Sequence, residues 1–80
     1  MIDISSKQIA AARAILNLTQ DEFALECGFN RTTIVALEKG SRKYLRKPTI
    51  GKIHAAFKRL NVHVINSDLG EGIFLMKEKS

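Results

Sequence analysis

Four consecutive hydrogen-bonding residues, Asn-Arg-Thr-Thr at positions 30–33, open a segment that has the apolar spacing of a helix. An asparagine in the first of these positions can cap the helix. The arginine that follows carries a planar fork of donors that can bind two acceptors at once. Neither a glycine-rich phosphate loop nor a catalytic triad nor a pair of convergent carboxylates accompanies these residues. The sequence therefore predicts binding chemistry, and we expect the protein not to be an enzyme.

Basic residues are concentrated in the part of the chain that follows. From Lys39 to Ser67 the sequence contains no aspartate or glutamate, although the net charge of the whole chain is only +5. Eight of the thirteen basic residues lie in this window, namely Lys39, Arg42, Lys43, Arg46, Lys47, Lys52, Lys58 and Arg59. Such a concentration of positive charge favours an extended polyanion as the partner. The alternative is a surface that is basic and simply solvated.

The chain is short, and its composition excludes several classes of protein. Its 80 residues are enough for one small domain, residues 1–80, and too few for a large interior catalytic cleft. The lone Cys27 cannot form an internal disulfide, which favours a reducing compartment, and we expect the bacterial cytoplasm or nucleoid. No long apolar run suggests a signal peptide or a membrane span. His54 and His63 have no acidic or thiol residues at ligand spacing, so neither a metal nor a cofactor is expected.

Apolar periodicity and capping residues predict four helices, at about residues 6–17, 20–27, 31–39 and 48–60. The residues expected to begin or end them are Ser5 or Ser6, Asn17, Thr19, Gly28, Asn30, Gly40, and Pro48 with Thr49. A single residue, Phe29, separates the end of the second helix from the cap of the third. Two helices joined by so tight a turn must cross steeply, which is the geometry of a helix-turn-helix unit.

The last twenty residues, 61–80, change to the alternating period of strands. "NVHVI" and "GIFLMK" are predicted to form a β-hairpin around a turn-rich connector at 66–72. One face of a hairpin can cover the helices, which leaves Ile65, Phe74 and Met76 on the other face. We expect this apolar patch to be the interface of a homodimer. The alternatives are that it is exposed on a hairpin bent over the core, or that a partner protein covers it.

Two charged residues fall on apolar helical stripes. Arg13 lies on the inward side of the first helix and Glu38 on the inward side of the third. Because an unpaired buried charge is costly, we expect these two residues to form an ion pair that concerns architecture and not ligand binding. The alternative is that either long side chain reaches past its neighbours to solvent.

The outward face of the third helix is where ligand contacts are expected. Its residues are Arg31, Thr32, Val35, Ala36 and Lys39, with the longest hydrogen-bonding side chains at the N-terminal end. That end of a recognition helix faces base edges in the major groove of DNA. We expect Arg31, Thr32 and Ala36 to contact bases, and Gln20, at the start of the second helix, to contact a phosphate.

The stretch "LTQDEFALECGFNRTTIVALEKG", residues 18–40, resembles the Cro/C1 (XRE) type of helix-turn-helix domain found in bacterial and phage transcriptional regulators. The matching positions are Leu18, Thr19, Gln20, Ala24, Gly28, Asn30, Ile34, Leu37, Glu38 and Gly40. Arg13 matches the arginine that such domains pair with the glutamate. The resemblance covers about residues 6–60 and implies a mainly α, four-helix, lambda-repressor-like domain that binds double-stranded DNA; here a C-terminal β-hairpin replaces the fifth helix.

The resemblance also implies a function and a set of contacts. A dimeric repressor is the simplest expectation, and a protein-interaction module or antitoxin-like regulator is the alternative. In this family, residues aligned with Gln20 and Lys39 touch phosphates, and those aligned with Arg31, Thr32 and Ala36 read bases. The basic loop from Gly40 to Pro48 is longer than is usual in the family, and its phosphate contacts are expected from its charge alone. The full set of expected phosphate contacts is Gln20, Asn30, Thr33, Lys39, Arg42, Lys43, Arg46 and Lys47. For Thr32 and Thr33, ordinary helix-start chemistry is the alternative.

Overall fold

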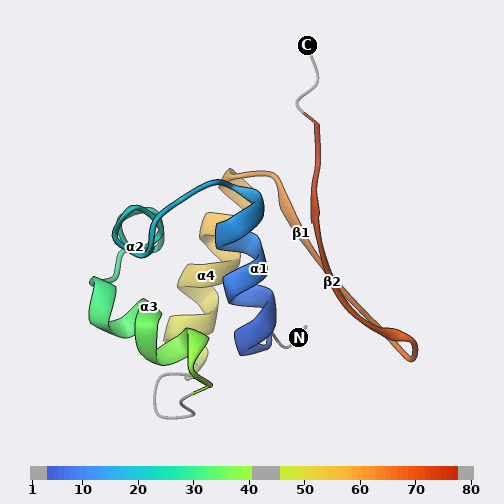
Figure 1. Ribbon diagram of the computed structural model, residues 1–80, viewed down its shortest axis with the longest axis horizontal. Helices are drawn as coiled ribbons and strands as arrows, with labels where there is room; N and C mark the ends of the chain where they lie inside the picture. Colours follow the sequence, from blue (N-terminus) through green and yellow to red (C-terminus); the bar gives the residue numbers. More distant parts are fainter. Residues whose placement is uncertain (1–3, 41–45, 78–80) are drawn as a thin grey trace.

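The computed structural model describes residues 4–40 and 46–77. These residues form helices α1 (Ser6–Ile15), α2 (Gln20–Cys27), α3 (Arg31–Glu38) and α4 (Lys47–Arg59), followed by strands β1 (Val62–Ser67) and β2 (Gly70–Leu75). Helix α2 packs against α3 and α4, and α3 packs against α1. The hairpin rests on α1 through β2 and on α4 through β1, on the side away from α2 and α3 (Figure 1). The predicted fold, four helices followed by a C-terminal hairpin, is confirmed.

The helices begin at the residues that the sequence indicates. Ser5 and Thr19 each form a complete capping box, with Gln8 and Glu22 respectively. Asn30 accepts a hydrogen bond from the third backbone N–H of α3. Helix α4 begins one residue before the predicted Pro48, and its cap residue, Arg46, makes no side-chain capping hydrogen bond within the described residues.

The helix ends also follow from residue type. Asn17, just after α1, has φ of 57°, and Gly28, after α2, has φ of 79°. Glycine adopts this left-handed conformation without steric cost, and asparagine tolerates it better than most residues. The chain can therefore reverse sharply between α2 and α3.

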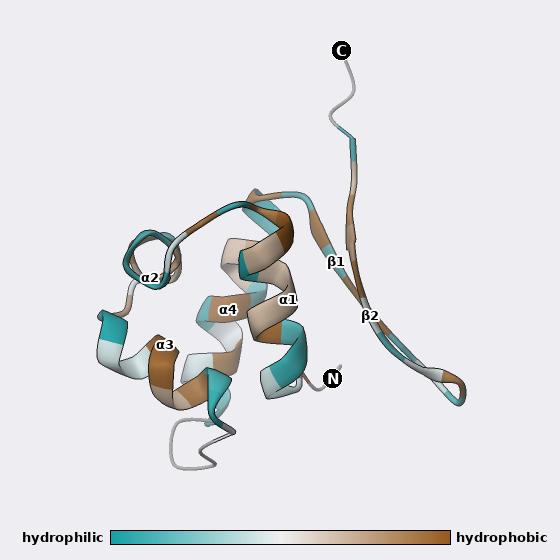
Figure 2. Cartoon of the chain, in the orientation of Figure 1, coloured by the Kyte–Doolittle hydropathy of each residue, from teal (hydrophilic) through white to brown (hydrophobic). Residues whose placement is uncertain are grey.

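One apolar core joins the four helices. Its largest fully buried side chains are Phe23, Phe57, Ile9, Ile34, Leu37 and Ile53. The Phe23 and Phe57 rings tie α2 to α4, with centroids 6.2 Å apart. In Figure 2 apolar segments occur on every helix and along both strands, so the hairpin adds to this core instead of standing apart from it.

The hairpin has a shorter turn than predicted. The connector expected at 66–72 is wrong in length, because only Asp68 and Leu69 form the turn and the strands pair from Ser67 and Gly70 onward. The hydrogen bonds between the strands are made by backbone groups. Polar residues can therefore continue a strand as readily as apolar ones where the hairpin extends beyond the helices. The antiparallel register places Ile65 opposite Gly72.

Gln8 anchors the hairpin to α1. This side chain is only 2% exposed, and its Nε2 donates to the carbonyl oxygens of Ile65 at 3.0 Å and of Gly72 at 3.1 Å. The hydroxyl of Ser5 also lies 2.8 Å from a carboxylate oxygen of Glu71. Val62 and Val64 complete the contact by burying their side chains against the helices. The hairpin is therefore fixed by specific hydrogen bonds as well as by apolar packing.

Candidate nucleic-acid interface

An ion pair fixes helix α3 against α1. Arg13 Nε lies 2.7 Å from Glu38 Oε2, and Arg13 Nη2 lies 3.0 Å from Glu38 Oε1. These are the two parallel bonds of a bidentate pair, and they raise the pKa of the Arg13 guanidinium. Nη1 of the same arginine donates to the carbonyl of Leu18 at 3.2 Å. The pair expected from the sequence is present, and it also holds the connection between α1 and α2.

The turn before α3 sets the direction of that helix. The N–H of Phe29 donates to the carbonyl of Ala24 at 2.8 Å, which closes the end of α2. Lys52 of α4 places its Nζ 5.4 Å from the centre of the Phe29 ring. Ile34 and Leu37 are fully buried on the inner side of α3. The opposite side of α3 is therefore held outward.

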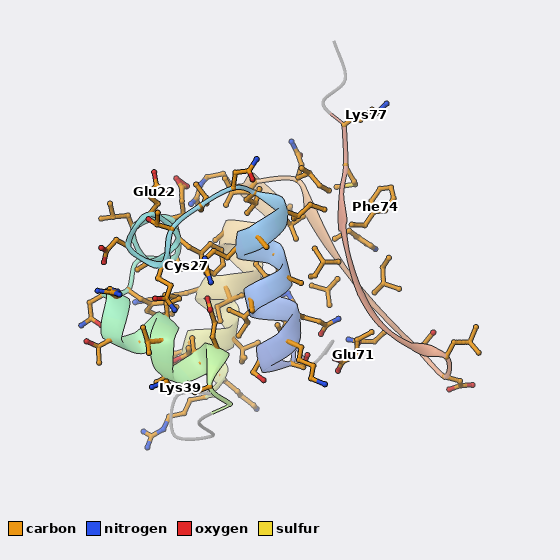
Figure 3. The ribbon with its side chains drawn as sticks, in the orientation of Figure 1. Glu22, Cys27, Lys39, Glu71, Phe74 and Lys77 are labelled. Carbon is orange, nitrogen blue, oxygen red and sulfur yellow. The ribbon has the colours of Figure 1, made fainter. Side chains whose placement is uncertain are left out.

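That outward side forms a shallow hollow of about 360 Å³, lined by Arg31, Thr32, Val35, Ala36 and Lys39. The three residues expected to contact bases all lie in it. Arg31, Thr32 and Lys39 are exposed and none of the five carries a negative charge. Lys39 marks the C-terminal end of this face in Figure 3. We name these five residues the α3 face.

Two of the expected phosphate contacts are engaged in capping α3. Oδ1 of Asn30 accepts both the backbone N–H of Thr33 at 3.0 Å and the Thr33 hydroxyl at 3.1 Å. The amide group of Asn30 stays available as a donor. Thr33 would have to give up its bond to Asn30 before its hydroxyl could donate to a phosphate, and its contact with DNA stays a prediction.

A second hollow, of about 460 Å³, lies at the start of α2. It is lined by Arg13, Thr19, Gln20, Asp21 and Arg31. Backbone N–H groups of a first helical turn attract an anion, and Arg31 adds a positive charge, whereas the charge of Arg13 is balanced by Glu38. Asp21 opposes that attraction, and the sequence interpretation did not assign it to this site. Because Arg31 lines both hollows, one side chain connects the start of α2 with the α3 face.

The expected phosphate contact at Gln20 has a second role. Its Nε2 donates to Glu38 Oε1 over a long distance of 3.4 Å, and the residue is half-buried. Gln20 thus connects the start of α2 to the Arg13–Glu38 pair. Because the Gln20 side chain is partly engaged with Glu38, the backbone N–H groups of this turn are the more available donors for a phosphate.

The other basic residues assigned to phosphates fall in two groups. Arg46 and Lys47 are exposed at the start of α4, whose first turn contains no acidic residue. Arg42 and Lys43 lie outside the described residues.

Cys27 does not contribute to this surface, and His54 and His63 line a different hollow, between α4 and the hairpin. Cys27 is buried, and burial raises the pKa of its thiol to about 11. Across residues 4–40 and 46–77, no group of three or more histidine, cysteine, aspartate or glutamate side chains is placed to hold a metal ion. Over the same ranges, every helix falls short of the length and apolar content that a membrane span requires.

A short helix, a tight turn and a second helix that presents an acid-free polar face together define a helix-turn-helix DNA-binding domain. A family model described as helix-turn-helix matches residues 9–64, and the chain belongs to this family, which is the Cro/C1 type. No curated protein matches the chain. The family consists of DNA-binding regulators of transcription and is generally non-enzymatic, so the protein is a DNA-binding regulator.

Proposed function

We propose that this protein is a sequence-specific repressor that binds an operator as a dimer, with α3 of each copy in the major groove. The observation that carries the proposal is the α3 face, an exposed and acid-free surface with arginine at its N-terminal end. A dimer bound over a promoter would exclude RNA polymerase by occupying the same DNA.

Base recognition is assigned to three side chains. Arg31 can donate two hydrogen bonds to the O6 and N7 atoms of a guanine. Thr32 offers either its hydroxyl to a base edge or its methyl group to thymine. The short side chain of Ala36 allows the helix to approach the groove closely and to contact a thymine methyl. These contacts would make binding depend on sequence.

Phosphate binding is assigned to residues around the α3 face. Lys39 lies at the end of α3, and Arg46 and Lys47 lie at the start of α4, where the positive end of the helix adds to their charge. Gln20 and the first N–H groups of α2 would hold a phosphate on the other side of α3. These contacts would position the protein without reading sequence.

Dimerisation is assigned to the hairpin. Ile65, Phe74 and Met76 are exposed by 42%, 55% and 42%. These side chains share one face of the hairpin, and a small protein rarely leaves a contiguous apolar patch in water unless a partner covers it. A symmetric dimer would present two α3 faces to two half-sites, so its operator would be an inverted repeat.

The test is selection of binding sites from random duplex DNA at near-physiological salt, where phosphate attraction alone does not dominate. We expect an enriched inverted repeat. The matched control is the Arg31→Ala, Thr32→Ala double variant, which retains the phosphate contacts and should enrich a weaker and less defined sequence. A wild-type pool without enrichment would contradict the proposal and favour the protein-interaction alternative.

A further inference from the structure

Strand β2 has an edge that nothing in the described part of the chain pairs with. Among residues 4–40 and 46–77 the sheet contains β1 and β2 only, so β2 is hydrogen-bonded there on one side. Met76 N–H donates to the Asn61 carbonyl at 2.9 Å, and bonded and non-bonded pairs alternate along an antiparallel ladder. The backbone groups of Glu71, Ile73 and Leu75 therefore point away from β1. An edge of this kind is a template for another strand.

We propose that β2 pairs with β2 of a second copy, antiparallel, about a two-fold axis at Phe74. The two hairpins then form a single four-stranded sheet. This inference deepens the dimer of the proposed function by naming its contact and its register. The outward backbone groups of Ile73 bond to those of the partner's Leu75, and the same bonds repeat on the other side of the axis.

Charge complementarity selects this register. An axis at Phe74 places Glu71 opposite the partner's Lys77, and this pair occurs twice in the dimer. Figure 3 shows Phe74 between Glu71 and Lys77 along the chain, with Lys77 just beyond the end of β2, and both charged residues are exposed. Opposite charges directly across two strands stabilise the pairing. An axis at Ile73 would satisfy the backbone equally well, but it would place Glu71 opposite the apolar Leu75.

The apolar residues of the outer face also fit this register. Gly72 lies opposite the partner's Met76. A Cβ atom at Gly72 would lie 3.7 Å from the Cβ of Ile65, so the space over this glycine borders Ile65. The partner's Met76 can lean across the glycine and contact Ile65, while the two Phe74 rings meet at the axis. The three exposed residues of the hairpin patch thus gain cross-strand neighbours in a single arrangement.

The proposed pairing keeps the DNA-binding surfaces free. A two-fold axis perpendicular to the sheet keeps both helical bodies on the same side of it. Helix α3 lies on the far side of the helices from the hairpin (Figure 1). The two α3 faces therefore stay uncovered in the dimer.

The first test exchanges the two charges. Glu71→Lys or Lys77→Glu alone would place like charges at both ends of the paired strands, and we expect the dissociation constant of the dimer to rise about tenfold in sedimentation equilibrium. The double variant restores opposite charges across the strands but, like Glu71→Lys, lacks the bond from Ser5 to Glu71. Its dissociation constant should therefore fall below that of either single variant, toward the wild-type value. A double variant that dissociates as much as, or more than, either single variant would overturn the register.

The second test is a covalent bond across the axis. Opposite residues in a non-hydrogen-bonded antiparallel pair have Cβ atoms about 4.5 to 5.5 Å apart, close enough for a slightly adjusted disulfide. We expect the Phe74→Cys variant to form a disulfide-linked dimer under mild oxidation. The control is Leu69→Cys at the hairpin turn, where the native side chain is fully exposed. Equal cross-linking of both variants would contradict an axis at Phe74.

Both tests are made without DNA, so the two proposals fail separately. If the wild-type protein and its variants give the expected dimer results but no operator is enriched, sequence-specific repression is refuted and the strand pairing stands. If an inverted repeat is enriched but the substitutions change neither the dissociation constant of the dimer nor the cross-linking as expected, the strand pairing alone is refuted.

Discussion

The α3 face and the outer surface of the hairpin have opposite chemistry. Arg31, Thr32 and Lys39 are polar and well solvated when nothing is bound. Phe74 of the hairpin leaves 55% of its surface in water, where each Å² of apolar area costs about 25 cal/mol. A polar surface can release its ligand at little cost, whereas an apolar one favours a partner at all times. Under the proposed function, this difference would give a reversible contact with DNA at one side and a lasting contact with a second copy at the other.

The largest expected effect comes from breaking the support of the α3 face. Arg13→Met leaves Glu38, whose side chain is 11% exposed, without its partner. We expect the free energy of unfolding to fall by about 2 to 4 kcal/mol, somewhat below the range for fully buried pairs. Urea denaturation at fixed protein concentration measures it.

The control for this prediction is the Arg13→Met, Glu38→Leu double variant. Removing both charges leaves no unpaired carboxylate, so most of the loss should be recovered. If Arg13→Met were as stable as the wild type, the prediction would be wrong, and the Glu38 carboxylate would be well solvated without the arginine.

The next effect separates the two kinds of contact within the DNA-binding surface. Arg31→Ala should cost about 1 to 3 kcal/mol in binding and relax the preference at one base position of each half-site. Lys39→Ala should weaken binding to all sequences and reduce the salt slope by about one. Titrations against a panel of operator mismatches at several salt concentrations distinguish them. Identical profiles for the two variants would contradict the division of roles.

A smaller effect is expected where the hairpin meets α1. Gln8→Leu keeps the size of the side chain but removes the donor to the Ile65 and Gly72 carbonyls. We expect a loss of about 1 to 2 kcal/mol. Hydrogen exchange should show faster exchange at hairpin amides and little change in α3. Uniform loss of protection in both regions would mean that they unfold as one unit.

The smallest effect is a pH dependence that belongs to neither surface. Burial raises the pKa of the Cys27 thiol to about 11, from an ordinary value of 9.0. Below pH 9 the thiol is neutral in both states; above it the unfolded thiol ionises first, so stability falls between pH 9 and 11. At pH 10 the loss is about 1 kcal/mol. Cys27→Ala should lack this part of the decline, and parallel stability curves for the two proteins would contradict the assignment.

Sequence reasoning predicts the helices well because their signals are local. Asn17, Thr19 and Gly28 act through their own backbone conformation or a cap three residues away. The Arg13–Glu38 pair was predictable for a different reason. Each charge lies on the apolar stripe of its helix, and burying both costs least when they pair with each other.

The parts that the sequence does not reveal depend on distant atoms. Gln8 is explained locally by its capping box, which hides its second role as donor to carbonyls of both strands. Asp21 is a good first-turn residue of α2, and only the folded arrangement places it beside Arg31. The predicted hairpin turn was too long because side-chain periodicity alone cannot distinguish polar residues at the end of a strand from polar residues in a loop.

The support of α3 from its inner side alone has an evolutionary consequence. Ile34, Leu37 and the Arg13–Glu38 pair hold the helix, while Arg31, Thr32 and Lys39 make no side-chain hydrogen bond within the described residues. Under the proposed function, replacing Arg31 and Thr32 would change the preferred DNA sequence with little loss of folding free energy. A duplicated copy of the gene could therefore acquire a new operator through a few substitutions, without passing through unstable intermediates.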